Sequence, residues 1–133
     1  MKALIHIQIR MSDLDPFGHA NNGTIANYFD VGRTVFFEQA FGFEIDWSKM
    51  DLIMVHGEFD FNAPIVFNDK IVCETSLEKI GNKSVALYQE IRDEKGNVKS
   101  ICRSVLASVD REKNVSAPVR EEYRQLLNQY AKR

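Results

Sequence analysis

The feature that most constrains the fold is a long apolar segment that follows a polar turn. From Thr24 to Phe41, ten of eighteen residues are apolar, and the only charges are Asp30, Arg33 and Glu38. The Asn and Thr residues at its start are good caps, and Gly42 is a plausible stop, so the segment predicts a long helix. A helix that is apolar on most of its faces must be buried on several sides. The rest of the chain therefore has to wrap around it.

The other segments mostly have the two-residue period of strands. Strand-like runs cover residues 3–9, 52–67, 70–80, 84–92 and 99–110. Within the second run, Gly57 is expected to mark a bulge or bend, and Pro64 to interrupt the hydrogen bonding. Gly-Asn turns separate the last three runs, which should form an antiparallel meander. Residues 119–130 are expected to close the chain as a short helix.

This order predicts an α+β fold, in which an antiparallel sheet of about five strands wraps one long central helix and a short helix ends the chain. With 133 residues, 44% of them hydrophobic, the chain fits one domain spanning residues 1–133. Wrapping leaves sheet edges and helix ends exposed, so we expect a homo-oligomer, a dimer or a tetramer of dimers. Trp47 is expected to anchor the irregular segment 44–50.

Composition argues against several classes of function. A net charge of −2 gives no general reason to bind nucleic acid or an anionic membrane. No stretch is long enough for a membrane span and the first ten residues lack a signal-peptide core, so the expected location is the cytoplasm. Cys73 and Cys102 lie far apart in strand-like runs and are expected to be buried free thiols. The two cysteines and the three scattered histidines make no recognisable set of metal ligands, so we predict no metal site.

The turn before the helix gathers the candidate chemistry. The first N–H groups of a helix are unpaired, and together with the helix dipole they attract an anion or a carbonyl oxygen. Asp15 lies a few residues upstream, where Pro16 restricts its backbone, so a carboxylate and several N–H donors are expected to face one cleft. Composition alone nevertheless favours a purely structural turn, because Asp-Pro followed by Gly and Asn is common turn chemistry.

Over nearly its whole length the chain resembles the hotdog-fold acyl-CoA thioesterases, in particular the group that includes 4-hydroxybenzoyl-CoA thioesterase and the thioesterases of bacterial Tol-Pal operons. The resemblance is carried by IRMSDLDPFGHANNGTIANYFDVGR, EFDFNAPIVFNDK, EKIGNKSVALYQEIRDEKG and SVLASVDREKNVSAPVREEYRQLL. Matching positions in the first stretch are Asp15, Gly18, His19, Asn21, Asn22, Tyr28, Phe29, Asp30 and Arg33. Ile25 stands where the family often has Tyr, and Asp30 where it often has Glu, which bears on the shape of the acyl pocket.

The resemblance implies an enzyme that hydrolyses acyl-CoA or acyl-carrier-protein thioesters without any cofactor beyond the coenzyme A of the substrate. In this family the aspartate aligned with Asp15 attacks the thioester carbonyl or activates water, and a backbone N–H aligned with Asn22 polarises the carbonyl oxygen. His19 is weighed as a proton-transfer residue, with a structural role in the turn favoured. The candidate substrate contacts are Gly18, Asn21 and Gly23 at the turn, with Asn82, Lys83 and Ser84 for the coenzyme A phosphates.

Two other functions stay open as alternatives. A non-catalytic hotdog module that binds acyl groups or acyl carrier protein has no need of an acid at Asp15. A dehydratase acting on hydroxyacyl thioesters needs a His and a helix carboxylate placed together. Glu38 and Glu58 are alternative acids, although Glu38 is expected to face solvent.

Overall fold

The computed structural model describes residues 1–42 and 50–132, so the role expected for Trp47 lies outside the described residues. The elements in chain order are β1 (Ala3–Ile7), the 3-10 helix η1 (Met11–Asp13), α1 (Asn22–Phe41), β2 (Leu52–Phe61), β3 (Ile71–Ile80), β4 (Ser84–Asp93), β5 (Val98–Asp110), β6 (Val115–Ser116) and α2 (Glu121–Asn128). This is the α+β order that the sequence predicts. None of the helices in the described ranges is long and apolar enough to cross a membrane.

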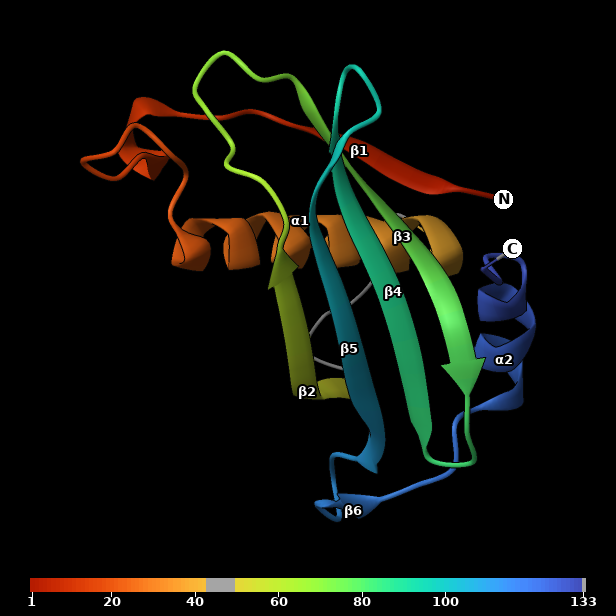
Figure 1. Ribbon diagram of the computed structural model, residues 1–133. Helices are drawn as coiled ribbons and strands as arrows, with labels where there is room; N and C mark the ends of the chain where they lie inside the picture. The colour runs from red at the N-terminus through yellow and green to blue at the C-terminus, as the bar shows by residue number, and fades with distance from the viewer. Residues whose placement is uncertain (43–49, 133) are drawn as a thin grey trace.

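The sheet is antiparallel and its strand order is β1-β3-β4-β5-β2, with β6 paired to the end of β5. The β3–β4–β5 meander is therefore confirmed. The short strand β6 was not predicted, because two residues are too few to show a period. As Figure 1 shows, α1 crosses one face of the sheet, while α2 lies beside β3.

Strand β2 differs from the expectation in where it bends and where it ends. A bulge or bend was predicted at Gly57. The pairing register instead shifts around Val55, two residues earlier. The strand ends at Phe61, before Pro64, and does not continue to Phe67. Proline has no N–H to give to a ladder, which agrees with an end before that residue.

Helix α1 buries one side and leaves the other in solvent. Its buried side chains include Ile25, Phe29, Phe36 and Phe37, which face the sheet. Its exposed residues include Asn27, Asp30, Val31 and Thr34, which recur at helical spacing. Within one chain, the expectation of burial on several sides is therefore wrong, because the exposed residues of α1 gather on one stripe.

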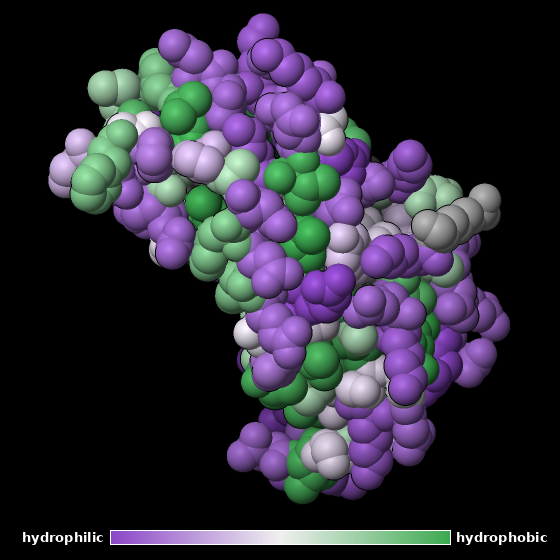
Figure 2. Space-filling model, viewed as in Figure 1, coloured by the Kyte–Doolittle hydropathy of each residue, from purple (hydrophilic) through white to green (hydrophobic). Residues whose placement is uncertain are grey.

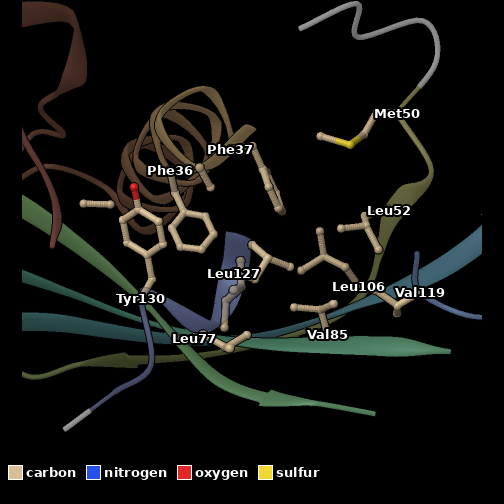
Figure 3. Close-up of a cluster of buried hydrophobic side chains, with 13 residues drawn as sticks. Phe36, Phe37, Met50, Leu52, Leu77, Val85, Leu106, Val119, Leu127 and Tyr130 are labelled. Carbon is tan, nitrogen blue, oxygen red and sulfur yellow. The ribbon is translucent and has the colours of Figure 1, made fainter. Parts of the chain in front are cut away.

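The core consists of two apolar clusters. The first surrounds the C-terminal half of α1 and includes Phe36, Phe37, Leu77, Leu87, Leu127 and Tyr130 (Figure 3). The second surrounds the N-terminal half of α1 and includes Ile25, Phe29, Ile65, Ile71 and Ile91. Burying each such side chain contributes about 1.5–3 kcal/mol, so both halves of the helix are anchored by packing.

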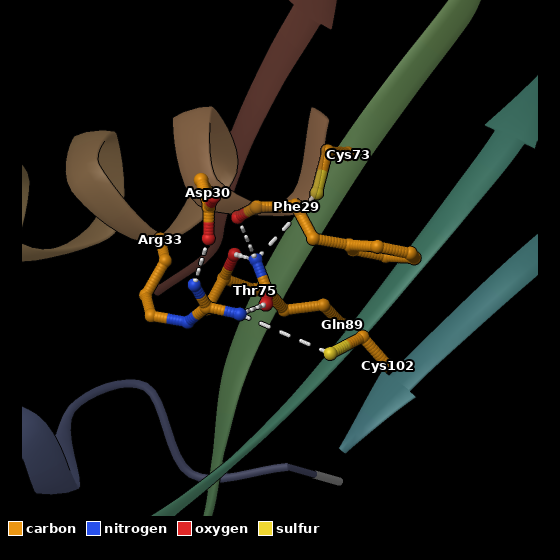
Figure 4. A network of polar contacts seen from close by, with 7 residues as sticks. All are labelled: Phe29, Asp30, Arg33, Cys73, Thr75, Gln89 and Cys102. Carbon is orange, nitrogen blue, oxygen red and sulfur yellow. Dashed lines mark hydrogen bonds and ion pairs between the residues drawn. The ribbon is translucent and has the colours of Figure 1, made fainter. Parts of the chain in front are cut away.

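A buried polar row lies where the two clusters meet. On α1, Arg33 falls between the residues of the second cluster and those of the first. Thr75 occupies the same boundary on β3, and Gln89 occupies it on β4. Fully buried Gln89 is the hub, as Figure 4 shows: its amide nitrogen donates to the Phe29 carbonyl oxygen and to Thr75 Oγ1, at 3.0 Å each.

The row also holds the one buried cation among the described side chains. The Arg33 guanidinium donates to Gln89 Oε1 at 3.1 Å and pairs with Asp30 at 2.7 Å. The helix approaches the sheet closely here, since a Cβ on Gly32 would lie 2.5 Å from Cys73 Sγ. Polar contacts and close approach together fix the position of α1 along the sheet.

Both cysteines are free and buried, as expected, and we expect them to resist alkylation in the folded protein. Burial raises the pKa of Cys73 to about 12 and also raises the pKa of Cys102 above its usual value, so little thiolate is present at neutral pH. Mass spectrometry after iodoacetamide treatment should find neither thiol labelled in buffer and both labelled in denaturant. Rapid labelling in buffer would contradict the buried positions.

Candidate active site

One oxygen of the Asp15 carboxylate keeps a tight turn closed. Oδ1 accepts hydrogen bonds from the N–H groups of Phe17 at 2.9 Å and His19 at 3.2 Å. The backbone closes the turn, because Asp15 N–H donates to the His19 carbonyl at 2.8 Å and Gly18 N–H donates to the Asp15 carbonyl at 2.9 Å. Gly18 has a φ of 79°, a left-handed conformation that favours glycine.

Asp93, at the end of β4, builds the same turn and shows what is different about Asp15. Its Oδ1 also accepts from the N–H groups two and four residues on, Lys95 and Asn97. The second oxygen of Asp93 is engaged by the Asn97 side chain at 3.1 Å. The second oxygen of Asp15 accepts no hydrogen bond from any described residue. One oxygen of Asp15 therefore holds the turn, and the other is available to a ligand.

The start of α1 supplies two unpaired N–H donors. Asn21 is the N-cap residue, since its side chain accepts from Thr24 N–H at 2.8 Å and its carbonyl accepts from Ile25 N–H at 3.0 Å. No described residue accepts from the N–H groups of Asn22 and Gly23. The positive end of the helix dipole adds to the attraction of these two donors for an anion or a carbonyl oxygen.

Backbone contacts hold the turn between the helix start and the loop that follows β2. Leu14 and Ala20 form a bridge across the turn, and His19 forms another with Val66. Ala20 N–H also donates to the Ile65 carbonyl at 2.8 Å. These contacts bring Asp15, Gly18, His19, Asn21, Asn22 and Gly23 to one end of the molecule.

The cleft that Asp15 and the helix N–H donors were expected to face is not one of the two hollows described for the single chain. A hollow of about 350 Å³ lies between the two chain ends and the outer face of the sheet, with Glu74, Tyr88 and Lys132 in its wall. A second, of about 760 Å³, lies beside the β5–β6 hairpin. Neither includes a residue of the turn, and no hydrogen bond joins Asp15 to the first turn of α1 among the described residues.

The residues expected at the coenzyme A phosphates lie at the other end of the sheet (Figure 1). Asn82 and Lys83 lie in the β3–β4 connection and Ser84 begins β4, a full strand away from the loop that contacts the turn. Ten residues of strand span about 30 Å, so one chain does not bring these three residues together with Asp15. Lys83 is exposed and makes no ion pair with a described residue. Arg92, another basic residue of the β3–β4 hairpin, pairs with Glu74 and Glu90.

The alternative acids do not join the turn. Glu58 is exposed on β2, where its carboxylate lies 3.2 Å from His56 Nε2. Glu38 is near the C-terminal end of α1 and is half-buried, not fully in solvent as expected. No His side chain is paired with a carboxylate of α1 in the described parts of the chain. In residues 1–42 and 50–132, no group of three His, Cys, Asp or Glu side chains is placed to hold a metal ion.

Asp13 is buried next to the turn and was not among the residues predicted from the sequence. Its Oδ2 accepts from the Tyr28 hydroxyl at 2.7 Å and from Arg10 N–H at 2.9 Å. Burial would raise the pKa of Asp13, but these two hydrogen bonds and the Arg10 guanidinium hold it below its usual value. Burial and the nearby Asp13 raise the pKa of Tyr28 well above its usual range.

The sheet wrapped on a central helix, with an acidic turn at the start of that helix, defines a protein of the hotdog type. Residues 9–127 match the model of the Thioesterase-like superfamily, so the chain belongs to that family. Family membership makes the chain a thioester hydrolase. Comparison with curated protein sequences gives no match.

Solved structures agree with this fold. A predicted thioesterase from Bacillus stearothermophilus superposes with a TM-score of 0.91 at 25% identity, covering 100% of this chain and 98% of that one. A Thermus thermophilus thioesterase complexed with coenzyme A and Zn gives 0.86 at 22% identity, covering 98% and 94%. The DHNA-CoA thioesterase from Staphylococcus aureus gives 0.82 at 18% identity, covering 96% and 89%.

Proposed function

We propose that this chain hydrolyses acyl-CoA thioesters to a free acid and coenzyme A, with Asp15 as nucleophile or general base. The observation that carries the proposal is the free second oxygen of Asp15, in contrast to the fully engaged carboxylate of Asp93 in the same kind of turn. The first N–H donors of α1 lie a few residues further on and suit the thioester carbonyl oxygen.

In this proposal the free oxygen of Asp15 attacks the carbonyl carbon, or takes a proton from a water that does so. The negative charge then develops on the carbonyl oxygen, where the N–H groups of Asn22 and Gly23 stabilise it. One such donor is worth roughly 3–4 kcal/mol in other acyl-transfer enzymes. The tetrahedral intermediate collapses by expelling the thiolate of coenzyme A. If Asp15 attacks directly, a water then hydrolyses the mixed anhydride between Asp15 and the acyl group, which frees the acid and restores the carboxylate. If Asp15 acts as base, the proton that it took from water passes to the departing thiolate. His19 keeps a structural role, because its backbone closes the turn.

Three finer assignments are part of the proposal, namely the group within the family, the substrate class and the location. We place the chain in the group that includes 4-hydroxybenzoyl-CoA thioesterase and the Tol-Pal-associated thioesterases, on the match of Asp15, Gly18, His19, Asn21 and Asn22. The structures of relatives complexed with coenzyme A support coenzyme A thioesters as the substrate class. The two free thiols suit a reducing compartment, so we retain the cytoplasm as the location. No metal or cofactor is proposed.

We also propose that residues 1–133 act as one domain and that the active unit is a homo-oligomer, dimer or tetramer. Among the described strands, β2 lies at one edge of the sheet, and it carries exposed apolar side chains, namely Ile53, Met54, Val55 and Phe61. Figure 2 shows such apolar surface breaking the hydrophilic cover on this side of the molecule. Because about 30 Å of strand separates Asp15 from Lys83, a role for Asn82, Lys83 and Ser84 in phosphate binding requires them to come from a second copy.

The direct test is the release of free thiol from a panel of short, long and aromatic acyl-CoA compounds. We expect steady release from at least one of them. The opposite outcome is that the folded protein, immobilised on a column, binds an acyl-CoA while releasing no thiol from any compound. That result would make the chain a non-catalytic binding module and not an enzyme.

Asn22→Pro, compared with Asn22→Ala, distinguishes the role of the Asn22 backbone N–H from that of its side chain. Proline is favoured at the first position of a helix, and the extended backbone of Asn21, with φ −72° and ψ 161°, accommodates a following proline. The substitution removes the Asn22 N–H, so kcat should fall by about 10²-fold or more. Asn22→Ala keeps that N–H and should retain most of the activity. Equal kcat in the two variants would show that Asn22 N–H does not polarise the carbonyl.

A further inference from the structure

The buried Asp13–Tyr28 pair connects the turn with the body of α1. The two side chains are 4% and 5% exposed, and the Tyr28 hydroxyl donates to Asp13 Oδ2 at 2.7 Å. Tyr28 lies in the second turn of the helix, whereas Asp13 lies two residues before Asp15. Burying a carboxylate is costly unless it is hydrogen-bonded, so these contacts have to be kept together.

Asp13 also contacts the helix start through its backbone. Its carbonyl oxygen accepts from the N–H of Asn21, the N-cap residue of α1, at 3.2 Å. Its side chain and backbone therefore contact α1 at two points, one beside the N–H groups of Asn22 and Gly23 and one a turn further on. Asp15 follows directly, in a turn that its own hydrogen bonds keep closed. Moving Asp13 would move the Asp15 carboxylate relative to the donors of the helix.

We infer that Asp13 and Tyr28 are positioning residues, which set the placement of the Asp15 carboxylate relative to the N–H groups at the start of α1. The inference rests on the proposed function of Asp15. Neither side chain is asked to touch the substrate, since both are buried and occupied with one another. Their state is fixed near neutral pH, because the lowered pKa of Asp13 and the raised pKa of Tyr28 keep a carboxylate facing a phenol.

The test compares Tyr28→Phe with Tyr88→Phe as its matched control. Tyr88 is also buried, at 8% exposed, and its hydroxyl also donates to a carboxylate at 2.7 Å, that of Glu90. This second pair lies on the outer face of the sheet, away from the turn. Both variants lose a phenol–carboxylate bond of the same length, and only Tyr28→Phe disturbs the turn. The cost in stability should be smaller for Tyr88→Phe, since Glu90 is half-buried and still accepts from Arg92.

We expect Tyr28→Phe to lower kcat for acyl-CoA hydrolysis by about 30-fold, because a misplacement of about 1 Å costs up to 100-fold. Its KM should stay within about twofold of the starting protein, since coenzyme A contacts are unchanged. Tyr88→Phe should keep both constants. Full kcat in folded Tyr28→Phe, or an equal loss in both variants, would overturn the positioning role.

The conservative variant gives a second readout. Asp13→Asn keeps an oxygen that accepts from Tyr28 and from Arg10 N–H, so it should retain more kcat than Asp13→Leu, which has no acceptor. The reverse order would also overturn the inference. Failure of the proposed function would give a different result. In that case the unsubstituted protein releases no thiol, or the Asp15→Asn variant is as active as the unsubstituted protein. An active starting protein, an inactive Asp15→Asn and a fully active Tyr28→Phe would remove only the positioning role.

Discussion

Asp15→Asn is expected to lower kcat for thioester hydrolysis by about 10³-fold with the fold and the oligomeric state unchanged. The amide oxygen of Asn can still accept the N–H groups of Phe17 and His19, so the turn should stay closed. The amide neither attacks a carbonyl nor takes a proton at neutral pH. Thiol release, followed with the best compound of the acyl-CoA panel, measures the loss, and size-exclusion chromatography checks the assembly.

Asp93→Asn is the matched control, because it makes the same substitution in a turn of the same geometry. It should leave kcat unchanged within about twofold. If Asp15→Asn turns over normally, the acid at position 15 has only a structural role and the catalytic assignment is wrong. If both variants lose activity together, the loss comes from weakened turns and not from a missing nucleophile or base.

Gln89→Met is expected to lower the free energy of unfolding by about 2–4 kcal/mol, because it leaves a buried cation short of an acceptor. Methionine has nearly the volume of glutamine, so the cost arises from the lost hydrogen bonds to Arg33, Thr75 and the Phe29 carbonyl. Urea denaturation at a fixed protein concentration gives the difference.

The control for this prediction is Gln125→Met on the exposed side of α2, which should change the free energy of unfolding by less than about 0.5 kcal/mol. A Gln89→Met protein as stable as the unsubstituted one would mean that the row contributes no net stability. In that case apolar packing alone would hold α1 against the sheet.

The elements of the fold were predictable where the pattern is long and regular. Strands β3, β4 and β5 each show a clear two-residue period, and α1 is a long apolar run. The exact helix start was not, because Asn21, Asn22 and Thr24 are all good caps and only the backbone geometry selects Asn21. The irregularity at Val55 was missed for a similar reason: Gly57 is the residue that a sequence pattern points to, yet pairing with β5 decides the position.

The buried polar row shows a limit of hydrophobic patterning. Gln89 occupies the inward phase of β4, between Leu87 and Ile91, and that phase was the available signal. Its hydrogen-bond partners come from α1 and β3, however, and no local pattern predicts contacts between residues so far apart in sequence. A polar residue in an apolar phase is therefore better read as a sign of a buried network than as a break in the strand.

The candidate site was predictable in part. The resemblance to a family pointed to Asp15 and Asn22, whereas composition alone favoured an ordinary turn. What distinguishes Asp15 from Asp93 is the free second oxygen, and that depends on side-chain partners that the sequence does not reveal. The same holds for the placement of Lys83 at the far end of β3 from the acidic turn, which follows from strand direction and a strand length of about 30 Å, not from spacing along the chain.

The division of the core by Arg33, Thr75 and Gln89 has a consequence for how such a chain can diversify. Volume changes in one close-packed compartment are felt mainly by the neighbours that touch it. Substitutions at Ile25, beneath the acidic turn, and at Leu127, beyond the row, should therefore combine additively. The half of the core beneath the acidic turn can thus be repacked by itself, while the other half continues to support the scaffold.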